Sequence, residues 1–244
     1  MPLISKLLKL FLIVSILAGC ATAPTYRSNP QFSEKIQSAK RIVLIPLRTD
    51  VFQLTAGGVK EKMDEWTQQA KRNVMTAIQE NLSTKPLLFI KPFDIMLLST
   101  EKQDNLDETR ALYDAVSSSI LVHTYGQPPH RFAEKIKNFD YSLGPEIKEL
   151  VGDVDAALFV SCEDNIATAG RKAVQAGSMI LGALVGIAVT PNMGITSISM
   201  ALVDAESGFI MWYNAHASGG DHDLRNPIST TTLVKQLLKD LPIQ

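Results

Sequence analysis

The sequence has few cysteines and almost no net charge. Among its 244 residues only Cys20 and Cys162 carry a thiol, so the stability of the fold must come from packing instead of a disulfide framework. The 24 basic and 25 acidic side chains give a formal charge of −1, which provides no strongly basic surface. A disulfide-stapled scaffold and a nucleic-acid-binding protein are therefore both disfavoured.

The sequence also lacks the motifs of common enzyme chemistry. It has no G-x-S-x-G nucleophile elbow, no cysteine–histidine signature, no G-x-G-x-x-G and no Gly-Lys-Ser/Thr phosphate loop. Gly57-Gly58, between a predicted strand and a predicted helix, could present N–H groups to a phosphate, but without these motifs a flexible loop is favoured. We therefore predict a protein that is not an enzyme and binds no cofactor.

What the sequence does have is a charged and then apolar N-terminus that ends at a cysteine. Lys6 and Lys9 make the start of this region positively charged. The apolar run Leu10–Leu17 that follows them is too short to span a bilayer as a helix. The run closes with Leu17, Ala18 and Gly19 before Cys20. These residues resemble the lipobox of bacterial lipoprotein signal peptides.

The lipobox resemblance implies a location. In that family residues 1–19 are removed as the signal peptide, and Cys20 receives an S-diacylglycerol and an N-acyl chain such as palmitate. Each buried CH₂ contributes about 0.8 kcal/mol, so several chains together anchor a protein stably. Ala21 stands where an aspartate would favour inner-membrane retention, which implies the outer membrane and a domain facing the periplasm.

Cleavage before Cys20 also changes the charge and the thiol content. The removed segment carries two lysines and no acid, which takes the formal charge from −1 to −3. A lipidated Cys20 cannot form a disulfide, so Cys162 is left as the free thiol. It lies in the apolar run Ala156–Cys162, where we expect it to be buried and inert.

The mature chain divides into a tether and one domain. Residues 20–37 are small, polar or proline and predict a flexible tether, whereas 38–244 predict a single α/β domain. Arg41–Leu47 is a continuous aliphatic run typical of a strand covered on both faces. Apolar residues at steps of three or four from Val59 to Leu82 then predict an amphipathic helix.

The remaining pattern predicts further helices and strands. The expected elements are a strand at 87–90, a helix through Leu112, Val116 and Ile120 capped by Asn105 or Asp107, a short helix at 143–151, a strand at 156–162, a hairpin of 195–203 with 209–213, and a closing helix that begins within 229–232. Together they predict a three-layer α/β domain: a mixed sheet, amphipathic helices on its faces and a C-terminal antiparallel hairpin.

This order of elements resembles envelope lipoproteins with a compact α/β domain. The curli-secretion lipoprotein family and the N-terminal domain of the Tol-system translocation protein share the lipobox, the strand at Arg41–Pro46 before an amphipathic helix, the helix-to-strand step at Ile147–Val160 and the hairpin turn Leu202–Gly208. The resemblance implies an envelope component that works by binding protein partners, with a ring of copies as one possibility.

The segment from Gly170 to Thr190 has three open interpretations. Its uncharged part only just reaches the length of a transmembrane helix, and it could equally be a core element. In the third interpretation Gly182 and Gly186, four residues apart, let two backbones approach closely and form a self-association surface.

A loop near the C-terminus carries the residues of the alternative function. His216, Asp221, His222 and Asp223 are possible metal ligands, although their spacing matches no zinc or calcium motif and a solvated loop is favoured. The favoured function is a lipid-anchored, non-catalytic accessory or assembly component of an outer-membrane or secretion complex. The alternative is a metal-dependent binding protein or hydrolase that uses this loop.

Overall fold

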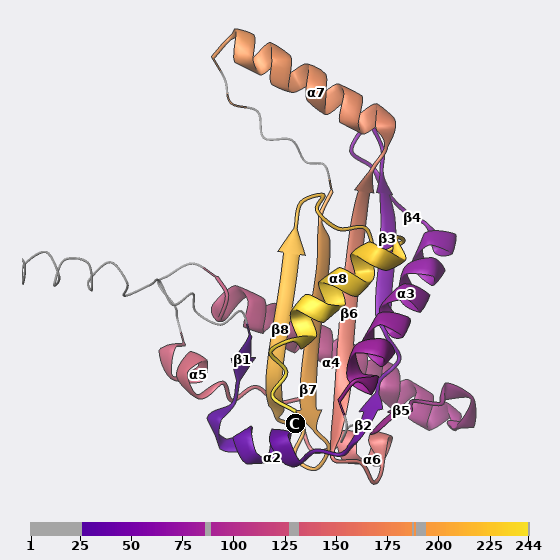
Figure 1. The fold of residues 1–244 in the computed structure, drawn as a ribbon, viewed down its shortest axis with the longest axis vertical. Helices are drawn as coiled ribbons and strands as arrows, with labels where there is room; N and C mark the ends of the chain where they lie inside the picture. Colours follow the sequence, from indigo (N-terminus) through magenta and orange to yellow (C-terminus); the bar gives the residue numbers. More distant parts are fainter. Residues whose placement is uncertain (1–25, 86–88, 127–131, 187, 189–193, 244) are drawn as a thin grey trace, which may run out of the picture.

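The computed structural model describes residues 26–85, 89–126, 132–186, 188 and 194–243 (Figure 1). Its elements in chain order are β1 (Arg27–Ser28), a 3-10 helix η1 (Pro30–Phe32), α2 (Ser33–Ser38), β2 (Arg41–Leu44), β3 (Arg48–Leu54), β4 (Lys60–Lys62), α3 (Asp64–Ser83), β5 (Phe89–Pro92), a 3-10 helix η2 (Ile95–Leu97), α4 (Thr100–His123), α5 (Ala133–Asn138), α6 (Ile147–Val151), β6 (Ala156–Ala167), α7 (Ala169–Leu184), β7 (Thr196–Asp204), β8 (Ile210–Ser218) and α8 (Pro227–Leu238).

A mixed sheet of eight strands forms the middle layer. Its main order is β1-β8-β7-β6-β2-β5, and β3 pairs with β6 and with β4. β2 and β3 follow one another along the same edge of the long strand β6 and run parallel to it, separated at Pro46, which cannot donate a ladder hydrogen bond. β7 is antiparallel to both β6 and β8. The predicted mixed sheet with a C-terminal antiparallel hairpin is confirmed.

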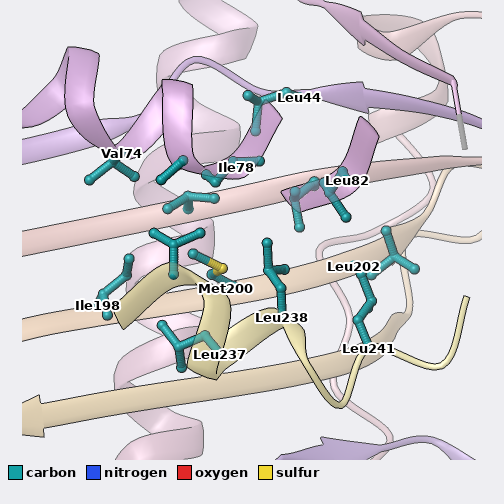
Figure 2. Close-up of a cluster of buried hydrophobic side chains, with 14 of the residues drawn as sticks. Leu44, Val74, Ile78, Leu82, Ile198, Met200, Leu202, Leu237, Leu238 and Leu241 are labelled. Carbon is teal, nitrogen blue, oxygen red and sulfur yellow. The ribbon is translucent and has the colours of Figure 1, made fainter. Parts of the chain in front are cut away.

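α3 and α8 cover one face of the sheet and build the larger core (Figure 1). The apolar side chains of α3 recur at helical spacing, as predicted, and those of α8 meet them over β6 and β7. α8 begins at Pro227, before the expected start within 229–232, because the side chain of Asn226 caps it by accepting hydrogen bonds from the N–H groups of Ile228 and Ser229. Figure 2 shows part of this core, formed by Leu44, Val74, Ile78, Leu82, Ile198, Met200, Leu202, Leu237, Leu238 and Leu241.

α4 and the shorter helix α6 lie against the opposite face. Tyr113 and Ile120 of α4 pack into a second core that includes Phe159 of β6 and Tyr213 of β8. Ser99 caps α4 by accepting a hydrogen bond from the N–H of Lys102, so the helix starts earlier than the expected caps at Asn105 or Asp107. With helices on both faces, the predicted three-layer α/β domain is confirmed.

The structure shortens the expected tether. β1 pairs with Tyr213 and Trp212 of β8, and Ile36 of α2 is buried in the larger core. Lys35 also places its Nζ 2.6 Å from the buried carboxylate of Asp204. The prediction of a tether over residues 20–37 is therefore wrong from Arg27 onward. The sequence did not reveal these elements, because a two-residue strand and a six-residue helix are too short to show a period.

The segment before α3 also differs from the prediction. The helix expected from Val59 begins at Asp64, and Lys60–Lys62 form β4 instead, paired with β3. Gly57-Gly58 lies in the turn of this β3–β4 hairpin, where Gly58 has a φ of 87° and donates its N–H to the carbonyl of Thr55. The glycine pair does not open a helix, so the helix-terminus phosphate interpretation is wrong.

Candidate functional site: the α7 arm

α7 extends from the end of β6 away from the sheet (Figure 1). The side chain of Thr168 starts the helix by accepting a hydrogen bond from the N–H of Arg171. Large apolar side chains along the helix are exposed to solvent: Val174, Met179, Ile180, Leu181, Leu184 and Val185. The interpretation of this segment as a core element is therefore wrong for α7.

The exposed apolar side chains of α7 gather on one side of the helix, with the exception of Met179. Val174 and Leu181 are seven residues apart, and Ile180 and Leu184 are four apart, so helical geometry brings them to one broad face. Arg171 and Lys172 supply positive charge in the first turn, and no acidic residue occurs between Asp164 and Asp204 in the sequence. A contiguous exposed apolar face of this kind marks an interaction surface.

The two glycines of the predicted self-association surface have different environments. Gly182 is buried within α7, whereas Gly186 lies just beyond the helix with a φ of 74°. A left-handed residue at this position is the usual way for a helix to end. Gly186 is thus explained by helix termination, and Gly182 is the glycine that still requires an explanation from packing.

Among the described residues, no helix has the length and hydropathy to cross a bilayer.

The two imidazoles of the His216–Asp223 segment lie together, but His216 belongs to β8 and only His222 lies in the loop that was expected to carry both. The rings of His216 and His222 lie 5.3 Å apart between centroids, and burial lowers the pKa of His216. Asp223 is turned to Arg225, with 2.8 Å between Oδ2 and Nη2; burial opposes its ionisation, but the hydrogen bonds from Arg225 prevail and lower its pKa. In the described part of the chain no three His, Cys, Asp or Glu side chains gather as a metal site.

A buried carboxylate that the sequence did not single out holds this loop in place. Asp164 of β6 accepts a hydrogen bond from the hydroxyl of Thr196 at 2.8 Å and another from the N–H of Leu224 at 2.9 Å. Burial raises the pKa of Asp164. The signal in the sequence was an acidic pair, Glu163 and Asp164, directly after the apolar run Ala156–Cys162. The loop is therefore ordered by hydrogen bonds to the sheet.

The two cysteines differ in what the structure says of them. Cys162 is buried in β6, and burial raises the pKa of its thiol to about 12, which keeps the reactive thiolate scarce. The expectation of a buried, inert thiol is confirmed. Cys20 and the lipobox residues Leu17, Ala18 and Gly19 lie outside the described residues, so lipidation stays a prediction.

A cavity of about 390 Å³ opens between α4 and the sheet. Asp114, Ser117, Ser118 and Leu121 form its α4 wall, and serines and alanines of β6, β7 and β8 form its floor. In the sequence, Ser197 and Ser199 of β7 indicate only the polar side of a hairpin strand. Their alignment with Ser161 of β6 depends on strand register, which the sequence does not reveal.

Comparisons with known proteins identify no family. No protein-family model and no curated protein matches the sequence. The chain is similar to solved structures of a PelC dodecamer from Paraburkholderia phytofirmans (10% identity, 90% of this chain and 96% of that chain, TM-score 0.39), the lipoprotein GNA1162 from Neisseria meningitidis (12%, 83% and 99%, TM-score 0.30) and the LpoB C-terminal domain from Salmonella enterica (12%, 78% and 95%, TM-score 0.25). The likeness to curli-secretion and Tol proteins stays a prediction, and with such low TM-scores the function must be argued from this chain's own residues.

Proposed function

We propose that this protein is a lipid-anchored component of the bacterial envelope that binds a protein partner through α7 and performs no catalysis. The lipobox-like sequence at Cys20 supplies the anchor, on the outer membrane and facing the periplasm. The observation that carries the binding role is the exposed apolar face of α7. The partner is a second copy of the chain or another envelope protein in an outer-membrane or secretion complex.

The short reach of the chain before β1 favours a protein partner for α7 over the membrane that carries the anchor. Five residues, 21–25, separate the lipidated cysteine from Tyr26, the first described residue, and a chain of this length spans at most about 20 Å. β1, which follows them, lies far from α7 along the longest axis of the molecule (Figure 1). If the longest axis of the domain stands perpendicular to the bilayer that carries the lipid, α7 lies away from that bilayer.

The expected contribution of α7 to binding follows from its exposure. Full burial of a leucine or isoleucine contributes about 1.5–3 kcal/mol. Ile180 is 64% exposed and Leu184 is 77% exposed, so covering both would contribute roughly 2–4 kcal/mol. Replacing both by serine is then expected to weaken the association by roughly 30- to 1000-fold.

Co-purification from cells tests this expectation. The tagged lipoprotein is recovered in detergent after chemical crosslinking, as the wild type, as Ile180→Ser with Leu184→Ser, and as the control Ile228→Ser. Ile228 on α8 is 79% exposed and matches Leu184 in exposure but not in position. We expect the partner with the wild type and the control and a strong loss with the α7 variant. Equal recovery of partners by all three proteins would refute the binding role of α7.

A further inference from the structure

The cavity beside α4 is hollow because small hydroxyl side chains stand where the rest of this sheet face carries large apolar ones. Toward one end of the sheet, Phe159, Tyr213 and Phe139 pack together and fill the space under α4. In the next rows, Ser161 pairs with Ser199 and Glu163 pairs with Ser197. Ala215 and Ala217 of β8 continue these rows, so all the residues of the floor except Glu163 are small: Ser161, Ser197, Ser199, Ala215 and Ala217.

A network of hydroxyl groups lies at the base of this cavity. The hydroxyl oxygens of Tyr113 and Ser199 are 3.0 Å apart, and those of Ser117 and Tyr213 are 2.8 Å apart. Ser117 also donates to Ser199 at 3.3 Å. Each hydroxyl can both donate and accept a hydrogen bond, so this base can adapt to either kind of group on a ligand.

The two acidic side chains that line the cavity, Asp114 and Glu163, are each paired with a basic residue outside its lining. Asp114 forms an ion pair with Arg48, and Glu163 lies 2.7 Å from the Nζ of Lys60. A strongly charged ligand would have to compete with these pairs, whereas an uncharged one would not. The site therefore favours a neutral ligand.

From this geometry we propose that the cavity binds a neutral saccharide unit. Five serines line the cavity and offer hydroxyl groups to the hydroxyls of a sugar, while Leu121 and the alanines of β8 offer apolar contact to its C–H groups. The volume of about 390 Å³ lies within the range of small-molecule sites, about 300–1,000 Å³. This binding site is separate from α7, so it stands or falls independently of the proposed function.

Ligand-observed saturation-transfer NMR on the full-length protein tests the proposal, in a detergent without a sugar headgroup. The neutral probes are maltotriose and N,N′-diacetylchitobiose, and the charged probes are digalacturonic acid and the glucosamine dimer chitobiose. Ser118→Trp fills the cavity from an exposed position of α4, and Leu121→Trp does the same one turn later. Ala115→Trp adds the same side chain to an exposed position of α4 that does not line the cavity.

We expect a neutral probe to bind the wild type and the Ala115→Trp control, and to bind the two filling variants at least about tenfold more weakly. Thermal midpoints verify that each variant is folded, and two filling variants keep the test valid if one of them does not fold. Absence of binding by both neutral probes at millimolar concentration would overturn the proposal. Tighter binding of a charged probe, or undiminished binding by both filling variants, would overturn it as well.

Discussion

Replacing Asp164 by alanine tests whether the His216–Asp223 loop is a structural feature held by the sheet. The side chain of Asp164 is almost fully buried and joins β6 to β7 and to the loop. If the loop is ordered by these hydrogen bonds, removing the carboxylate must destabilise the fold. If other contacts hold the loop instead, stability should change little.

The expected cost follows from the two donors that lose their acceptor. The N–H of Leu224, 2.9 Å from Oδ2, belongs to a fully buried residue and would be left unsatisfied, at about 1–3 kcal/mol. The hydroxyl of Thr196 is also 2.8 Å from the carbonyl of His222 and keeps that acceptor, so it adds at most about 1 kcal/mol. Burial raises the pKa of Asp164, which means that removing the charge returns part of this loss.

We therefore expect Asp164→Ala to lower the free energy of unfolding by about 1–3 kcal/mol, or the thermal midpoint by roughly 2–12 °C. Asp164→Asn is the matched control, because its amide oxygen can still accept from the N–H of Leu224, and it should cost less. Calorimetry of the three proteins gives both values. An unchanged midpoint for Asp164→Ala, or an equal loss for both variants, would refute the reasoning.

Three further predictions concern the lipid anchor, a histidine and the end of α7. Cys20→Ala should remain an uncleaved precursor that incorporates no labelled fatty acid; labelling of the variant would contradict the lipobox, and recovery of the wild type with inner-membrane vesicles would contradict outer-membrane sorting. Burial lowers the pKa of His216 in the fold, so the unfolded chain binds the proton more readily and stability should fall as the pH drops below about 6.5; denaturant titrations should show a weaker fall for His216→Gln, and an identical fall would exclude His216 as its source. Gly186→Leu places a branched side chain at a φ of 74° and should fray the end of α7 at a cost of roughly 1–2 kcal/mol, seen as faster hydrogen exchange at 181–185 with the global midpoint unchanged, whereas a large fall in the global midpoint would contradict the position of Gly186 outside the core.

The sequence was most informative where a period extended over several turns or strand residues. The helix through Val74 and Ile78 and the C-terminal hairpin follow from such periods, and the strand at Arg41–Leu44 follows from an unbroken aliphatic run. It was least informative for short pieces such as β1 and α2, whose formation depends on β8 and on the larger core. Tertiary contacts determine whether these elements form, and no local sequence pattern predicts them.

The candidate sites show the same limit. An uncharged segment with spaced glycines was recognised as unusual, but its exposure could not be predicted, because an apolar helix looks the same in a sequence whether it is buried or projects into solvent. The cavity was missed because Ser117, Ser161 and Ser199 come from three distant segments that only the fold aligns. Asp164 was missed because its hydrogen-bond donors, Thr196 and Leu224, lie far from it in the sequence.

Photo-crosslinking in intact cells from a residue of α7 tests the central claim most directly. A photoreactive amino acid replaces Leu181, which is 66% exposed on the apolar face, and in a second strain it replaces Ile228 on α8. We predict a discrete adduct from position 181, with a mass equal to this lipoprotein plus one protein partner, and no such adduct from position 228. If position 181 yields no protein adduct, or the same adducts as position 228, then α7 is not the surface through which this protein works.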